Sequence, residues 1–283
     1  MGSLVAALGS YLNVRHTGGT WLIRIDDIDQ PRTLPGMDQQ ILDTLATHGL
    51  ESDEPIRYSN QHLQDYQSAF NTLEDLGAVF PCSCSRQTVR QSQTSEGNTL
   101  IYNGRCRSGL NSVDTIRSFR IRVPDQLIEF EDHLQGVQAD RLTESVGDFV
   151  IKRVDGQFAY QLATVVDDHL QQITEVVRGC DLLPSTGRQI HLQRLLGYCQ
   201  PDYFHLPTVN NSRLEKLSKQ QGAAPIDPRH ASKNLIKALQ LLYQSPPNTL
   251  ILEHPSDIIR WGIEHWQTAA LTMKRVVTLP DEN

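Results

Sequence analysis

The chain has 283 residues, of which 39% are hydrophobic and 21% charged, and its formal net charge is −7. This composition is typical of a soluble globular protein, and the length fits one large or two modest domains with a sizeable core. No apolar run approaches the ~20 residues that a membrane helix needs, and no signal-peptide pattern opens the chain. The negative charge argues against non-specific coating of nucleic acid. Five arginines between residues 105 and 122 nevertheless make one segment basic, so a local patch can hold an RNA substrate.

Helical and extended patterns alternate along the chain. In the first half we predict helices over residues 4–14, 35–48 and 60–76, and strands over residues 21–25, 118–123 and 149–154. In the second half we predict helices over residues 159–168 and 185–196 around a strand at 173–177, and then helices over residues 235–243 and 258–272. Strands that alternate with helices predict an α/β fold with a parallel sheet.

Three of the five cysteines lie in one short segment. Cys82 and Cys84 are one residue apart, and Cys106 follows after a polar loop. Thiolates with this spacing can converge on one zinc ion, which prefers sulfur-rich tetrahedral sites. The candidates for a fourth ligand are His62 and Tyr102, and Tyr102 is better placed because it lies four residues before Cys106. Unligated buried thiols are the alternative interpretation.

The cysteines also indicate the compartment. Their number is odd and their clustering resembles a metal site rather than a disulfide framework, so we expect a reducing cytoplasm. The two remaining cysteines, Cys180 and Cys199, are expected to be plain buried thiols.

Charged residues follow two of the predicted strands. Asp26 and Asp27 come directly after the first strand, and Arg178 follows the strand at 173–177. In open α/β sheets, ligands bind at the carboxyl ends of the strands. There a carboxylate can hold an ammonium group, and a guanidinium can grip a carboxylate with two hydrogen bonds. Tyr160 can add a hydroxyl to the same pocket. A helix cap, a turn or a packed tyrosine would be the structural alternatives.

The segment Lys216-Leu-Ser-Lys219 lies between Pro207 and Gly222, where the sequence has little periodicity, which predicts a loop. Two lysines that flank the hydroxyl of Ser218 can follow a polyphosphate and neutralise the charge on a departing pyrophosphate. As a bare pattern this signal is weak, because an exposed loop with solvated lysines has the same sequence.

Taken in order, six motifs resemble those of one family: RIDDIDQPR, PCSC…YNGRC, FAYQLATVVDDH, RGCDLL, HLPTV and KLSKQ. The family is the glutamyl-queuosine tRNA(Asp) synthetases, short paralogues of glutamyl-tRNA synthetase among the class I aminoacyl-tRNA synthetases. The resemblance runs from Gly2 to about Gly222 and continues more loosely to the C-terminus. It implies a Rossmann-like class I catalytic domain in two parts, residues 1–80 and 151–222, an inserted zinc-binding and acceptor-like subdomain, residues 81–150, and a helical C-terminal region, residues 223–283.

The resemblance also implies an activity. Members of the family activate glutamate with ATP, without tRNA, and transfer it to the queuosine base of tRNA(Asp). The site residues then fall into three sets: Asp26, Tyr160 and Arg178 on glutamate; Lys216, Ser218 and the catalytic Lys219 on ATP with Mg²⁺; and Cys82, Cys84, Tyr102 and Cys106 on a structural zinc ion. We expect a cytoplasmic monomer that does not contact a membrane.

Two features depart from the family pattern. The acidic strand end usually begins Glu-Asp, whereas here it is Asp26-Asp27, and the shorter side chain retracts the carboxylate by about an ångström. In the family, the segment at Gly2 follows a strand and a HIGH-like histidine motif, so we expect an N-terminal truncation, with a misplaced start site favoured over a pseudo-enzyme or a fragment.

The alternative function is that of a catalytically impaired, zinc-stabilised tRNA-binding protein. Conventional glutamyl-tRNA synthetase is disfavoured because its anticodon-binding domain is not expected here.

Overall fold

The computed structural model of the protein describes residues 1–29, 34–92, 100–211 and 226–279. Its α-helices are α1 (Gly2–His16), α2 (Met37–Thr47), α3 (Leu63–Asp75), α4 (Arg86–Gln91), α5 (Leu142–Ser145), α6 (Tyr160–Leu170), α7 (Leu183–Leu196), α8 (Ala231–Leu241) and α9 (Pro255–Glu264). Its strands are β1 (Arg24–Ile25), β2 (Arg57–Tyr58), β3 (Val79–Cys82), β4 (Ser118–Ile121), β5 (Leu127–Asp132), β6 (Gly136–Arg141), β7 (Phe149–Arg153), β8 (Glu175–Gly179), β9 (Asp202–Leu206), β10 (Thr208–Asn210) and β11 (Val276–Thr278).

The described strands form four small sheets rather than one parallel sheet. The largest has the order β6-β5-β9-β8; β9 is parallel to β8 and to β5, whereas β5 and β6 are antiparallel. Strands β3, β4 and β7 form an antiparallel sheet, and β1–β2 and β10–β11 are parallel pairs. The α/β fold class is confirmed, and the largest sheet contains the expected parallel pairing at β5-β9-β8, to which β6 adds an antiparallel strand. Only three residues connect β5 to β6, and so short a connection can join only antiparallel neighbours.

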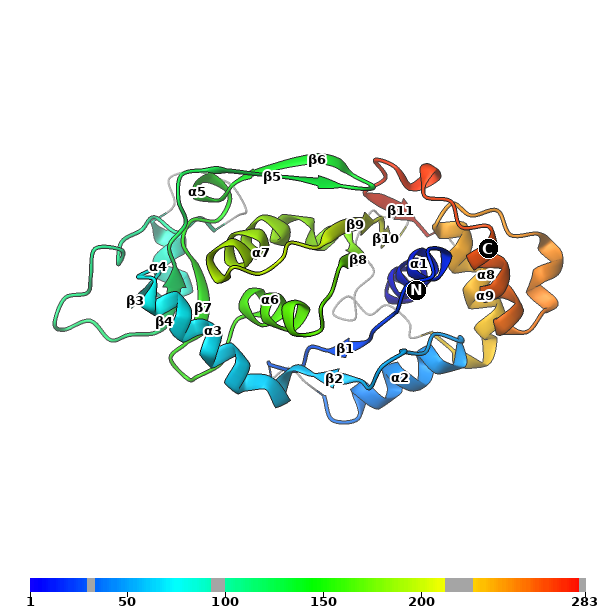
Figure 1. Ribbon diagram of the computed structural model, residues 1–283, viewed down its shortest axis with the longest axis horizontal. Coiled ribbons are helices and arrows are strands. Elements are labelled where there is room, and N and C mark those ends of the chain that lie inside the picture. The colour runs from blue at the N-terminus through cyan, green and yellow to red at the C-terminus, as the bar shows by residue number, and fades with distance from the viewer. Residues whose placement is uncertain (30–33, 93–99, 212–225, 280–283) are drawn as a thin grey trace.

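The molecule is elongated (Figure 1). Helices α6 and α7 lie near its middle, with β5 and β6 on one long side and β1 and β2 on the other. The antiparallel β3-β4-β7 sheet lies toward one end, and α8 and α9 lie toward the other. The two halves of the sequence therefore meet in the centre, where β8 and β9 end close to α1.

Two buried apolar clusters hold this arrangement together. In the first, α1 packs against α8 and α9 through side chains such as Leu8, Leu12 and Leu239, and the spacing of the α1 residues by four puts them on one helix face. In the second, α3, α6 and α7 pack against the strands, with Tyr66 and Ile190 fully buried. Strand β9 supplies residues to both clusters.

Helix α9 ends earlier than its sequence pattern predicts. The apolar periodicity continues to residue 272, but the helix ends at Glu264. Beyond it, the buried Trp266 donates a hydrogen bond from its indole N–H to Asn13 of α1 over 3.0 Å. The apolar residues of this segment therefore fill the first cluster from irregular chain and a single 3-10 turn, Ala269–Leu271, because tertiary contacts override the local preference.

Candidate functional site

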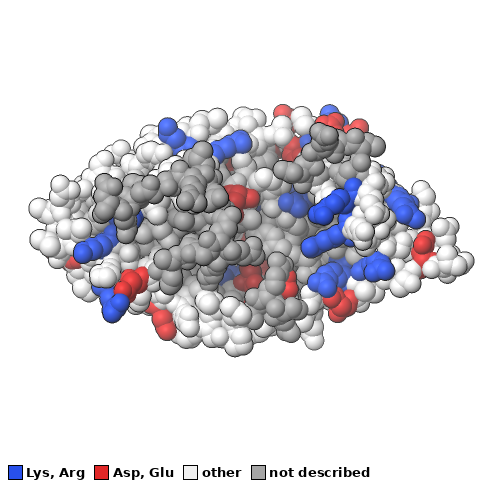
Figure 2. Space-filling model, turned by 180° about the vertical axis from the view of Figure 1, so that it is seen from behind, with Lys and Arg blue, Asp and Glu red and all other residues white. Residues whose placement is uncertain are grey.

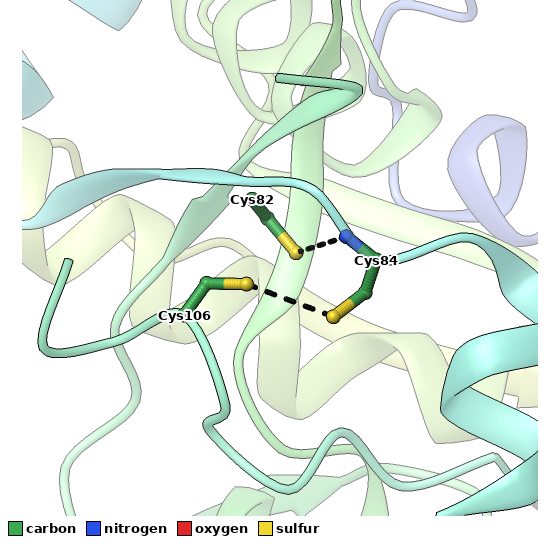
Figure 3. A group of neighbouring side chains, drawn as sticks. All are labelled: Cys82, Cys84 and Cys106. Carbon is green, nitrogen blue, oxygen red and sulfur yellow. Dashed lines mark hydrogen bonds between the residues drawn. The ribbon is translucent and has the colours of Figure 1, made fainter. Parts of the chain in front are cut away.

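The three clustered cysteines converge. Cys82 ends β3, Cys84 lies just before α4, and Cys106 returns from a later turn; all three are buried. Figure 3 shows their sulfur atoms pointing toward one another. The three sulfurs lie within 4.8 Å of each other, and Sγ of Cys84 is 3.6 Å from Sγ of Cys106. Around a tetrahedral zinc ion with Zn–S distances of about 2.3 Å, sulfurs stand about 3.8 Å apart. The cluster therefore has the size of a zinc site.

Tyr102 completes the cluster with an oxygen. Its phenolic oxygen is 3.6 Å from Sγ of Cys82 and accepts a hydrogen bond of 2.8 Å from the backbone N–H of Cys106. The guanidinium of Arg120 lies 3.9 Å from the centroid of the Tyr102 ring and donates from Nε to Sγ of Cys82 over 3.2 Å. A positive charge and a backbone donor both favour the deprotonated ligands that zinc requires. His62, the other candidate, is not part of the cluster and pairs with Asp65 instead.

The thiols of this cluster differ in acidity. Burial, together with hydrogen bonding to Cys106, raises the pKa of Cys84 to about 12. Burial acts in the same direction on Cys106, but hydrogen bonds from Tyr102 and Ser83 outweigh it and lower the pKa of Cys106 to about 7. The site therefore favours the thiolate form of Cys106. A bound cation would also favour the thiolate forms of the neighbouring cysteines. The residues present fit a zinc ion.

The other two cysteines are less buried than predicted. Cys180 is partly exposed, and Cys199 is exposed. The prediction of two plain buried thiols was wrong, because Cys199 lies in the turn between α7 and β9, where the chain runs over the surface.

A second group of charged side chains lies where β1 ends, beside α6. Arg24 donates from Nη1 to the carboxylate of Asp168 over 2.8 Å and from Nε to Asp26 over 3.0 Å. The side chain of Asp26 is 40% exposed, whereas that of Asp168 is 12% exposed. Asp26 is therefore open to a ligand, and Arg24 fixes it in place.

The neighbouring Asp167 is fully buried and joins several elements. Its carboxylate accepts hydrogen bonds from Nε of Arg57 (3.0 Å), from the hydroxyl of Ser59 (3.0 Å) and from the hydroxyl of Tyr66 (2.7 Å). Asp27 has a similar role, because it accepts the backbone N–H of Asn60 over 2.8 Å. These acids are structural. Asp167 holds the segments around β2 and α3 against α6, and Asp27 holds the segment after β2 to the end of β1.

Arg178, on β8, is close enough to Asp168 for its charge to act on that carboxyl group. Burial raises the pKa of Asp168, and the positive charges of Arg24 and Arg178 act against that rise, whereas Asp26 adds to it. The carboxylate of Asp26 and the guanidinium of Arg178 thus both act electrostatically on the same buried carboxylate. Arg178 donates from Nε to His205 and from Nη2 to Thr186, over 3.0 and 2.8 Å.

The remaining predicted site residues have different outcomes. Tyr160 is half-buried and is the first residue of α6, eight residues before Asp168, which corresponds to about 12 Å along a helix. The three predicted ATP-binding residues, Lys216, Ser218 and Lys219, lie outside the described residues. Sequence reasoning missed Arg24, Asp168 and the Asp132–His205 pair behind Arg178. The only available signal for Asp168 was the paired acid in VVDDH.

Comparisons with known proteins decide the family. Residues 1–235 match the family described as tRNA synthetases class I (E and Q), catalytic domain. The chain is 44% identical over 281 residues to the glutamyl-Q tRNA(Asp) synthetase of Dechloromonas aromatica, covering 99% of this chain and 93% of that protein. It is 46% identical over 265 residues to the enzyme of the same name from Aromatoleum aromaticum, with 94% and 84% covered. The chain belongs to the glutamyl-Q tRNA(Asp) synthetase family.

Solved structures agree with this family in fold. The glutamate-tRNA synthetase of Elizabethkingia anophelis superimposes with a TM-score of 0.79 at 20% identity, covering 99% of this chain and 65% of that one. A glutamate tRNA ligase of Elizabethkingia meningosepticum gives a TM-score of 0.78, also at 20% identity, with 98% and 64% covered. Our chain thus spans about two thirds of the length of these enzymes.

Two further expectations can be compared with these findings, one with a relative and one with the structure. The predicted N-terminal truncation is not supported by the comparison with the Dechloromonas aromatica enzyme, because the chain covers 93% of its length. Among the residues that the structure describes, every helix is too short or too polar to cross a bilayer.

Proposed function

We propose that this protein activates glutamate with ATP, without needing tRNA, and then transfers the glutamate to the queuosine base of tRNA(Asp). One observation carries the proposal: the guanidinium of Arg178 and the open carboxylate of Asp26 both lie within electrostatic range of the same buried acid, Asp168. An amino acid with an ammonium group and two carboxylates is complementary to this pair of opposite charges. The names of the close relatives support the same substrate and the same tRNA.

The proposed chemistry assigns a role to each predicted residue. Arg178 binds one carboxylate of glutamate, and Asp26 and Tyr160 receive its ammonium group. The other carboxylate attacks the α-phosphorus of ATP: an oxygen–phosphorus bond forms, and the bond from that phosphorus to pyrophosphate breaks. Lys219, with Lys216 and Ser218 beside it, neutralises the charge on the departing pyrophosphate together with the Mg²⁺ that accompanies ATP. The protein contributes mainly positioning and charge neutralisation.

The zinc ion has a structural role in this proposal. Cys82, Cys84, Tyr102 and Cys106 would hold it and so fix a loop beside the antiparallel β3-β4-β7 sheet. A bound zinc ion supplies folding free energy to such a subdomain.

We infer that the chain divides into a catalytic domain in two parts (1–80 and 151–222), the zinc-binding insertion (81–150) and a helical region (223–283). We also infer a cytoplasmic monomer.

The zinc-binding end is a suitable surface for tRNA. Seen from behind, Lys and Arg side chains gather toward the end that carries β3 and β4 (Figure 2). Arg105 and Arg117 line a shallow hollow beside Cys84. Because phosphate contacts dominate affinity for nucleic acids, a basic surface on an otherwise acidic protein marks where the RNA would lie.

Pyrophosphate exchange tests the first step. We expect glutamate, but not aspartate or glutamine, to support ATP–pyrophosphate exchange in the absence of tRNA. Lys219→Ala should slow the exchange at least about tenfold, as loss of one preorganised charge-stabilising group does. Lys233→Ala, which removes an exposed lysine of α8, is the matched control and should leave the rate unchanged. Wild-type protein that binds tRNA(Asp) but shows no exchange would contradict the proposal and favour the tRNA-binding alternative.

A further inference from the structure

Behind Arg178 lies a buried chain of polar side chains that the proposed chemistry does not use. It runs through three neighbouring strands: Asp132 on β5, His205 on β9 and Arg178 on β8. Arg178 and His205 are direct partners in the parallel register of β8 and β9, so their side chains stand on the same face of the sheet. His205 and Asp132 are almost completely buried, at 0% and 1% exposure. The burial of two ionisable groups requires a reason.

The hydrogen bonds fix where the proton of the imidazole lies. One carboxylate oxygen of Asp132 accepts the backbone N–H groups of Leu134 and Gln135, over 3.0 and 2.7 Å. The other oxygen is 2.5 Å from Nδ1 of His205. A carboxylate with this many donors is ionised and accepts the Nδ1 proton, which leaves Nε2 of the neutral ring as an acceptor. Nε of Arg178 donates to that atom over 3.0 Å.

A second hydrogen bond, to Thr186, also fixes the guanidinium of Arg178. Nη2 of Arg178 donates to the hydroxyl of Thr186, which is fully buried on α7. Nε and Nη2 form one edge of the planar guanidinium, and that edge is therefore held by His205 and Thr186. In the remaining edge, Nη2 makes one further contact, a long hydrogen bond of 3.5 Å to the backbone carbonyl of Leu182, and Nη1 has no hydrogen-bond partner among the described residues. This edge therefore keeps most of its donor capacity for a ligand.

We propose that His205, held in one tautomer by Asp132, is the positioning residue that directs the remaining edge of Arg178, with its unpartnered Nη1, at the substrate carboxylate. The inference rests on the proposed function, in which Arg178 binds glutamate. An arginine side chain has several rotatable bonds. Fixing the position of its guanidinium group before the substrate arrives therefore lowers the entropy lost on binding. Among the described residues that are proposed to bind a substrate, His205 contacts Arg178, so its effect should fall on glutamate and not on ATP.

Two substitutions at His205 separate positioning from a purely structural role. A glutamine side chain reaches about as far as Nε2 and can accept from Arg178, whereas an asparagine side chain ends near Nδ1 and can reach only Asp132. In pyrophosphate exchange, His205→Asn should raise the KM for glutamate at least about tenfold, as loss of a hydrogen bond to a charged group does. The KM for ATP should stay within about twofold, and His205→Gln should restore most of the affinity for glutamate.

The matched control is His191→Gln. His191 is also a buried imidazole, but it bonds the backbone carbonyl of Arg122 and has no contact with Arg178, so the KM for glutamate should not change. Equal glutamate KM values for His205→Asn and His205→Gln would overturn the inference, whether both match the wild type or both are raised. If the wild type itself shows no exchange, the proposed function fails instead.

A measurement on the wild-type protein decides the arrangement independently of activity. In protein labelled with ¹⁵N-histidine, the long-range ¹H–¹⁵N spectrum at neutral pH should show His205 neutral, with the proton on Nδ1 and none on Nε2. The signal is identified by its shift in Arg178→Lys. A proton on Nε2 would overturn the inference, because that atom could then not accept from Arg178.

Discussion

Arg24 and Asp168 form a salt bridge of 2.8 Å between positions 144 residues apart in the sequence. The contact joins the end of β1 to the last turn of α6, and both side chains are largely buried. Arg24 also holds Asp26 at the edge of the proposed glutamate site. The same arginine therefore serves the fold, through Asp168, and the site, through Asp26.

Loss of this arginine should destabilise the protein. Arg24→Met leaves the buried carboxylate of Asp168 without its partner, and breaking a buried ion pair in this way costs about 3 kcal/mol. Urea unfolding should show this loss. Arg141→Met removes one side of the exposed pair with Asp125 and should leave the free energy of unfolding nearly unchanged. Equal stabilities of the two variants would contradict the role given to Arg24.

The hydroxyl of Tyr66 should matter for stability because it satisfies a buried carboxylate. It donates to the buried carboxylate of Asp167 over 2.7 Å, and Tyr66→Phe removes this donor while keeping the ring that packs on Phe158. Loss of a hydrogen bond to a charged group should lower the free energy of unfolding by about 1.5–3 kcal/mol. Tyr243→Phe, at an exposed position, is the control. A neutral Tyr66→Phe variant would show that Arg57 and Ser59 suffice to satisfy Asp167.

The cysteine cluster predicts one zinc ion per chain. Protein purified without chelator should contain about one equivalent of zinc by elemental analysis, and Cys106→Ser should lose most of it because three protein ligands no longer close the site. Cys199→Ser, which changes an exposed cysteine outside the cluster, should retain the metal. Removal of zinc by a chelator should lower the melting temperature. Undiminished zinc in Cys106→Ser would rule out this ligand set.

Buried histidines predict a loss of stability in mild acid. Burial lowers the pKa of His48, His191 and His205 below the value of about 6.5 that each has in the unfolded chain. Below that value the unfolded chain binds more protons than the folded protein, so stability rises with pH. The stabilisation is complete above about pH 6.5 and is lost as the pH falls through the lower folded values.

The pH dependence can be assigned to particular rings. Free energies of unfolding measured in urea should decline steadily from pH 7 to pH 5. His191→Gln should have a shallower decline than the wild type, because one titrating group is removed. A slope unaffected by His191→Gln would mean that the ring is not buried in its neutral form.

Regular amphipathic helices were predictable from the sequence, whereas some strands were not. The apolar residues of α8 recur at the spacing of one helix face, and the structure buries that face through Leu235, Ile236 and Leu239. Strands β5 and β6 were missed because their alternation is obscured: Leu127 is 46% exposed and Val137 is 75% exposed, whereas Asp132 is buried. A buried acid and exposed aliphatic residues invert the usual signal, and only the partners of Asp132 explain it.

The site was predictable where chemistry is local. Cys82, Cys84, Tyr102 and Cys106 lie within 25 residues, so their spacing was informative, and the structure brings them together. The network behind Arg178 could not be read in the same way. Asp132 and His205 are 73 residues apart, and their pairing depends on the order in which β5, β9 and β8 lie in the sheet.

Transfer of glutamate to tRNA tests the central claim most directly. Radiolabelled glutamate, ATP and the protein should be incubated with tRNA(Asp) that carries queuosine and with the same tRNA lacking it. The account predicts that label enters only the queuosine-containing tRNA, and that Arg178→Lys reduces the transfer strongly because the bidentate grip on glutamate is lost. Equal labelling of both tRNAs, or no labelling of either by protein that supports pyrophosphate exchange, would contradict it.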